Sequence, residues 1–126
     1  MTRHVSLSII AVLATFSALV HAQDPKIVSP EMYEVLYEND EIRIIQVTYE
    51  PGQRDAPHSH PRYIAYVLGS GTLRVYPSDG GEAQIRVAEH GQIMVQEPAA
   101  HWAENIGDTV VKAVFMEIKD EPSGSR

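Results

Sequence analysis

Hydrophobic and polar residues alternate along much of the chain, in short runs. Within residues 41–50, the side chains of Ile45, Val47 and Tyr49 fall on one side of an extended backbone. Asn39-Asp40, directly before this run, is typical of the turn in a β-hairpin. The alternation with a period of two predicts a β-strand with one buried face.

The same kind of run recurs through the rest of the chain, and glycine or proline turns separate the runs. No window of ten or more residues after the first 22 has a convincing helical period. Many short strands at regular spacing indicate a sandwich or a barrel. We predict strands at residues 33–37, 41–50, 63–68, 72–76, 83–88, 92–97, 101–105 and 109–118.

The first 22 residues differ from the rest of the chain. Arg3 is their only charged residue, an apolar stretch follows it, and Val20-His21-Ala22 offers small residues at the positions that a signal peptidase reads. The alternative is a membrane anchor that stays uncut, but the stretch is shorter than the roughly 20 apolar residues that span a bilayer. We expect a signal peptide over residues 1–22 and a periplasmic or secreted product.

The remaining chain has the length of one domain with one core. We expect a flexible N-terminal segment at residues 23–32, where Pro25 and Pro30 lie, a single domain at 33–119 and a frayed polar tail at 120–126. The chain has no cysteine, so this domain must be stabilised by its core without disulfides.

The charge balance bears on the partners. The net charge is −7, and loss of the leader would remove one more basic residue. Such a surface repels nucleic acid and anionic membranes. We therefore expect a small-molecule ligand, no nucleic acid and no membrane after cleavage, and a homodimer that pairs through an exposed edge strand.

Three histidines are placed as a metal site requires. His58 and His60 are two residues apart, so both imidazoles project to the same side of an extended backbone. Pro57 and Pro61 flank the pair and stiffen the segment. His101 lies in a later β-prone run that a hairpin architecture can bring alongside. A lone His-x-His is a weak signal, and the third histidine strengthens it.

These residues stand in segments that resemble the two motifs of the cupin family, G-x5-H-x-H-x3,4-E-x6-G and G-x5-P-x-G-x2-H-x3-N. Residues 52–60 match the opening of the first motif in spacing. Residues 91–98 lead into His101, and Asn105 keeps the His-x3-Asn spacing of the second. The resemblance covers nearly the whole chain after the leader. It implies an all-β fold, a single double-stranded β-helix (cupin) barrel or jelly roll.

The sequence departs from the family pattern because it has no Glu in the stretch after His60, where the first motif places one. The resemblance then implies a site of three histidines, His58, His60 and His101, for one divalent Mn, Fe, Ni, Cu or Zn ion. Neutral ligands leave the full charge of the ion uncompensated, which favours anionic ligands. Tyr63 is a candidate fourth ligand, proton donor or orienting group.

The resemblance implies a range of functions, because one fold hosts many. The leading interpretation is a metal-dependent enzyme of the dioxygenase, isomerase or lyase type that acts on a small oxygenated or anionic molecule. The alternatives are a non-catalytic protein that binds a metal or a small ligand, and a barrel without metal. Arg54 and Arg62 flank the histidines and are candidates to pair with an anion, although surface solvation is the simpler role for each.

Overall fold

The structure, a computed structural model, describes residues 23–120. The predicted signal peptide and the end of the predicted tail, residues 121–126, lie outside this part of the chain. The elements follow the order α1 (Pro25–Val28), β1 (Tyr33–Glu38), β2 (Ile42–Tyr49), β3 (His58–His60), β4 (Tyr63–Gly69), β5 (Gly71–Pro77), β6 (Gln84–Ala88), β7 (Ile93–Gln96), β8 (Ala99–Asn105) and β9 (Val111–Ile118).

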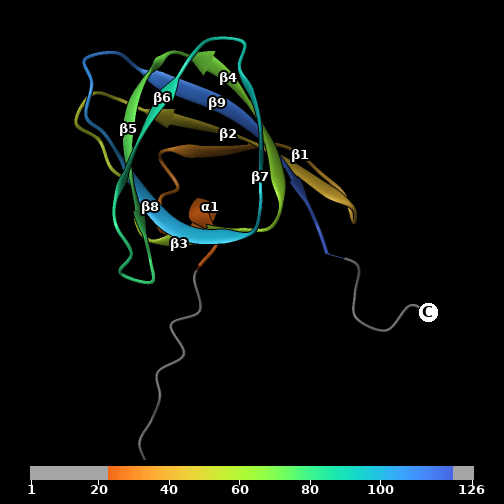
Figure 1. Cartoon of the computed structure of the whole chain (residues 1–126). Helices are drawn as coiled ribbons and strands as arrows, with labels where there is room; N and C mark the ends of the chain where they lie inside the picture. Colours follow the sequence, from red (N-terminus) through yellow and green to blue (C-terminus); the bar gives the residue numbers. More distant parts are fainter. Residues whose placement is uncertain (1–22, 121–126) are drawn as a thin grey trace, which may run out of the picture.

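The strands form two antiparallel sheets, one of five strands in the order β1-β2-β9-β4-β7 and one of four in the order β3-β8-β5-β6. The sheets face each other and enclose a common interior, and α1 contacts β1 and β3 (Figure 1). Strands far apart in sequence are neighbours, since β9 lies between β2 and β4. The predicted all-β barrel is confirmed.

The core lies between the two sheets. On β2, the inward residues Ile45 and Val47 are buried, as the alternation predicts. Val47 faces Ala113 of β9, which in turn faces Val67 of β4. Side chains two apart on each strand therefore line one continuous apolar interior.

Two local features were not predicted as elements. Residues 25–28 form a single helical turn, which begins where the Asp24 carboxylate accepts a hydrogen bond from the Lys26 amide at 2.9 Å. Its first residue, Pro25, is buried. The flexibility expected of residues 23–32 stays a prediction. The His58–His60 segment, expected only to be extended, pairs with β8 as a strand.

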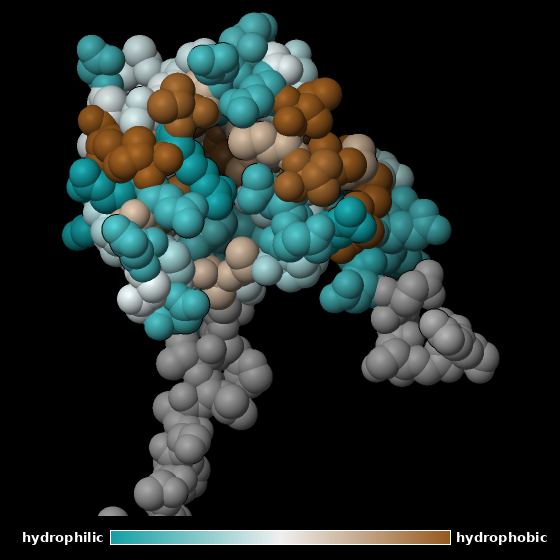
Figure 2. All heavy atoms as spheres, in the orientation of Figure 1, coloured by the Kyte–Doolittle hydropathy of each residue, from teal (hydrophilic) through white to brown (hydrophobic). Residues whose placement is uncertain are grey.

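The outer faces of the sheets carry many hydrophobic side chains. Figure 2 shows hydrophobic residues in groups on either side of a hollow in one face of the molecule. Among the large apolar side chains, Val87 of β6 and Ile93 of β7 are 61% and 66% exposed. In the described chain, no helix has the length and apolar character needed to cross a bilayer.

Candidate metal centre

The pairing of β3 with β8 gathers the three predicted histidines. His58 and His101 are direct partners across this antiparallel pair, and His60 pairs with Ala99. Opposite residues on one face of such a pair have Cβ atoms only about 4.5–5.5 Å apart. Because His60 is two residues from His58, its ring projects from the same face. The sequence prediction that these side chains meet is confirmed.

The three imidazoles, which we call the three-histidine cluster (His58, His60 and His101), converge inside the barrel. Their candidate ligand nitrogens all lie within 4.8 Å of one another. An ion that bonds imidazole nitrogen at about 2.0–2.1 Å spans nitrogen separations up to about 4 Å, so small ring rotations suffice. His58 and His60 are 0% and 3% exposed, so the cluster is not a surface turn pair.

The hydrogen bonds of His58 leave one of its nitrogens suited to ligation. Its Nδ1 lies 2.8 Å from the carbonyl oxygen of Ala56, so Nδ1 carries the proton and donates it there. Nε2 is then the unprotonated nitrogen. It lies 3.4 Å from the hydroxyl of Tyr33, but that hydroxyl donates its proton to Asp55 Oδ2 at 2.7 Å. The lone pair of His58 Nε2 is therefore left without a donor.

His60 provides the strongest indication that the cluster fits an ion. Both of its ring nitrogens are buried without a hydrogen-bond partner, and no other buried side-chain nitrogen or oxygen within residues 23–120 shares this condition. Leaving such a group unsatisfied costs about 1–3 kcal/mol. A metal ion on one nitrogen would satisfy it, and the donor set of neutral imidazoles suits a transition metal.

The buried carboxylate of Glu117 lies near the Nδ1 atom of His60. Glu117 Oε2 is 3.6 Å from His60 Nδ1, which is beyond a hydrogen bond. The other oxygen, Oε1, accepts hydrogen bonds from Arg43 Nε and Nη2 at 3.1 and 2.8 Å. Arg43 in turn pairs with Asp24 at 2.6 Å. Glu117 is thus placed to orient His60 when its Nε2 serves as ligand, as outer carboxylates do at metal sites.

A second buried carboxylate, Asp55, fixes the other side of the cluster. Its Oδ2 accepts hydrogen bonds from the hydroxyls of Tyr33 and Tyr49, and its Oδ1 accepts one from the Ala103 amide at 2.8 Å. The same Oδ2 lies 3.5 Å from His58 Nδ1. Burial, together with the Asp55 charge, raises the pKa of both tyrosines well above 10, so they remain hydrogen-bond donors.

The environment keeps two of the imidazoles neutral. Burial, followed by the charges of the neighbouring histidines and of Arg86, lowers the pKa of His101 to about 3. Burial also lowers the pKa of His58, although the Asp55 charge opposes this. Neutral imidazole is the form that binds metal, so both rings are ready for an ion at neutral pH.

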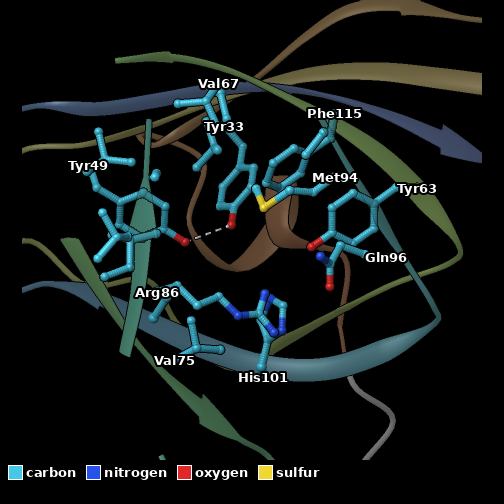
Figure 3. A pocket seen from close by; sticks show the side chains of 18 residues that line it. Tyr33, Tyr49, Tyr63, Val67, Val75, Arg86, Met94, Gln96, His101 and Phe115 are labelled. Atoms are coloured by element: carbon cyan, nitrogen blue, oxygen red, sulfur yellow. Dashed lines mark hydrogen bonds between the residues drawn. The ribbon is translucent and has the colours of Figure 1, made fainter. Parts of the chain in front are cut away.

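The cluster adjoins a cavity of about 70 Å³ in the barrel, which His101 lines. At roughly 10–15 Å³ for each water molecule, this volume has room for about five of them. Figure 3 shows Arg86 next to His101 on one side of the cavity, Tyr63 and Gln96 on another, and Phe115 and Met94 above. The remaining lining is mostly valine and alanine. The cavity therefore suits a small ligand with an apolar part.

Tyr63, the candidate fourth ligand or proton donor, lines the cavity beside His60. It is 4% exposed and points inward, whereas Ile64 is 36% exposed and points outward. The Tyr63 ring lies 5.0 Å from that of His60 and 4.6 Å from that of Phe115. Burial raises the pKa of Tyr63, although Arg86 opposes the shift. Its hydroxyl is therefore a proton donor at neutral pH.

Two other arginines named from the sequence lie outside the cavity. Arg54 is exposed, and its guanidinium lies 5.5 Å from the centre of the Trp102 ring. Arg62 is also exposed and forms an ion pair with Glu97 at 3.5 Å. Neither lines the cavity, so surface roles account for both.

Glu117 and Arg86 are not among the site residues predicted from the sequence. Glu117 follows Val111, Ala113 and Phe115 at every second position of the last strand, and this alternation could have placed it inward. Arg86 carries no such signal, because its apolar neighbours Ile85 and Val87 would be expected to occupy the inner face.

Comparison with known proteins agrees with this architecture. No protein-family model and no curated protein sequence matches the chain. Among solved structures, a cupin domain from Bordetella pertussis is 22% identical with a TM-score of 0.64, and the match covers 71% of this chain and 93% of that one.

Two further structures are similar over the same share of this chain, 71%. A cupin superfamily protein from Desulfitobacterium hafniense is 12% identical, with 77% of its chain covered and a TM-score of 0.54. A conserved protein with a double-stranded β-helix domain from Klebsiella pneumoniae is 21% identical, with 84% covered and a TM-score of 0.54. The chain thus has the double-stranded β-helix fold of the cupins, with three histidines gathered at one point inside it.

Proposed function

We propose that this chain is an exported metal-binding protein of cupin fold, in which His58, His60 and His101 hold one divalent Mn, Fe, Ni, Cu or Zn ion. We further propose that it is a metal-dependent enzyme of the dioxygenase, isomerase or lyase type. Its substrate would be a small oxygenated or anionic molecule in the adjoining cavity.

The observation that carries this proposal is the state of His60 within the cluster. Three imidazoles meet at one point, two of them buried and that of His101 half-buried, and both nitrogens of His60 lack a partner there. Apolar side chains at this position would fill the space without the cost of unsatisfied groups. The arrangement is understandable if an ion completes it.

Residues around such an ion would have different roles. Ala56 and Glu117 would fix the orientation of the His58 and His60 rings through their Nδ1 atoms. The ion would supply Lewis-acid or oxygen-activating chemistry. Tyr63 would donate a hydrogen bond or a proton to an anion in the cavity. The apolar lining would exclude water from the ligand.

One observation favours the alternative of a non-catalytic binding protein. Proton abstraction needs a general base within reach of the substrate. Both buried carboxylates near the cluster are already engaged, Asp55 by two tyrosines and Glu117 by Arg43. A protein that binds a metal and a small ligand without turnover needs no such base.

Three measurements on the purified protein separate the enzyme from the non-catalytic binding protein and test the metal ligands. Metal analysis of the wild type and of His58→Ala tests the ligand assignment, and equal metal content in both would contradict it. Titration of a cobalt-substituted sample with small anions, followed by visible absorption, then tests access to the metal. Oxygen-consumption and isomerisation assays distinguish the enzyme from the binder, and absence of turnover with retained anion binding would favour the binder.

Export is a separate part of the proposal and rests on the sequence of residues 1–22. Mass spectrometry of the protein from a culture that expresses the full chain should find a mature N-terminus at Gln23. A product that begins at Met1 would contradict it.

A further inference from the structure

Arg86 points into the barrel, against the polarity of its strand. On β6, Ile85 and Val87 are 54% and 61% exposed, while Arg86 between them is only half-buried and lines the cavity. Interior positions of small barrels are usually apolar, and exterior ones polar. Here Ile85 faces outward and Val87 is largely exposed although it also lines part of the cavity, while the guanidinium between them faces inward. The burial of apolar surface within this chain does not explain why an arginine occupies the inward position.

Among residues 23–120, the charge of Arg86 has no partner of opposite sign. In the part of the chain that the structure describes, carboxylates pair with Arg43, His58, His60, Arg62 and Lys119, but none lies within 4.0 Å of Arg86. A guanidinium stays charged at every physiological pH. A partly desolvated charge without a counter-ion is unfavourable, so an anion in the cavity would stabilise it.

Two other polar side chains line the cavity, and one of them, Tyr63, has its hydroxyl within hydrogen-bonding reach of Arg86. Tyr63 and Gln96 are direct partners across the β4–β7 pair, and both line the cavity. Figure 3 shows Tyr63 and Gln96 close to each other at the cavity. The guanidinium fork matches the two oxygens of a carboxylate, and a phenol or an amide can hydrogen-bond a second polar group of the ligand. Most of the remaining lining is apolar, with Val75, Met94 and Phe115 among it.

We propose that Arg86 is the recognition residue of this cavity and that its ligand is a small monocarboxylic acid with a short apolar body. The carboxylate lies at Arg86 beside His101, and the apolar body packs against Met94 and Phe115. The role of that acid as a substrate rests on the proposed function, because the three-histidine cluster adjoins the same cavity. Recognition by Arg86 itself does not require the metal.

The test compares isobutyrate with isobutyramide, which has the same shape without the charge. Calorimetric titrations use the wild type, Arg86→Gln and the matched control Arg74→Gln, whose arginine lies on the paired strand β5 and is exposed. Each protein is measured metal-free and loaded with zinc. Wild type and Arg74→Gln should bind isobutyrate more tightly than the amide. Arg86→Gln should weaken isobutyrate binding roughly 10–100-fold, as expected for loss of a hydrogen-bonded charge, and leave amide binding unchanged.

The proposal is overturned if Arg86→Gln and Arg74→Gln bind isobutyrate equally well, or if the wild type does not prefer isobutyrate to the amide. Arg86→Lys provides a second variant that keeps the charge and loses the fork, and it should bind isobutyrate less tightly than the wild type does. Wild-type affinity in Arg86→Lys would contradict recognition by the fork. Zinc content is measured on every sample. A wild type without zinc would contradict the metal site, while the metal-free titrations would still judge Arg86.

Discussion

Replacement of His60 by methionine should make the metal-free protein more stable, although His60 is one of its most buried residues. The two His60 nitrogens have no hydrogen-bond partner and together cost about 2–6 kcal/mol, at about 1–3 kcal/mol each. Methionine has a similar volume and no strong polar group. The change also removes ring contacts with Tyr63 and Phe115 at 5.0 and 5.5 Å, worth about 0.5–1.5 kcal/mol each. We expect a net stabilisation of about 1–3 kcal/mol.

The same substitution at His58 provides the control, and it should have the opposite sign. His58 Nδ1 donates to the Ala56 carbonyl at 2.8 Å, so His58→Met leaves that carbonyl without its partner. We expect a loss of about 1–3 kcal/mol. Urea unfolding of chelator-treated samples measures both variants against the wild type. Addition of zinc should raise the urea midpoint of the wild type but not that of either variant.

The reasoning would be refuted if His60→Met destabilised the metal-free protein as much as His58→Met does. The nitrogens of His60 would then have partners in solution, and their orphaned state could no longer support a metal. A zinc-induced shift that persists in His60→Met would separately exclude His60 from the ligand set.

Three further predictions concern pH, Glu117 and assembly. The folded-state pKa values of His58 and His101 lie below the usual 6.5, so the unfolded state binds more protons under acid conditions, and the stability of the metal-free protein should fall as pH drops from about 6.5 toward about 3. Urea midpoints at pH 7, 5.5 and 4.5 measure this fall. An equally steep fall in the His58→Gln/His101→Gln double variant would assign the loss of stability to other groups. Glu117→Gln should weaken zinc binding about 10–100-fold through the orientation of His60, which competition with a chelating dye measures, and unchanged affinity would contradict that role. Light scattering should give the mass of a dimer that pairs through an edge strand, and a monomer would contradict it.

The strands and the three-histidine cluster could be predicted because both depend on local periodicity and on family-like spacing. The alternation of Ile45, Val47 and Tyr49 correctly gave the inward face of β2. The two-residue spacing of His58 and His60 correctly gave a shared side. The exact pairing of His58 with His101 depends on the register of β3 and β8. That His101 lies in a separate β-prone run was enough to predict that the two strands meet.

The groups around the cluster could not be predicted, because they depend on contacts between distant strands. Arg43 and Glu117 are separated by 74 residues and meet only because β2 and β9 pair in one register. Asp55 lies in a loop with no periodicity, and its tyrosine partners come from two other strands. The inward side chain of Arg86 contradicts the hydrophobic pattern of its strand, so the pattern itself would have assigned it to the surface.

The most direct test of the metal centre is the metal content of the purified protein after incubation with zinc and removal of excess ion. We expect one equivalent in the wild type and in His90→Ala, since His90 is exposed and lies outside the cluster. We expect none in His60→Ala or His101→Ala. No bound ion in the wild type, or one equivalent in all four proteins, would contradict the proposed metal centre.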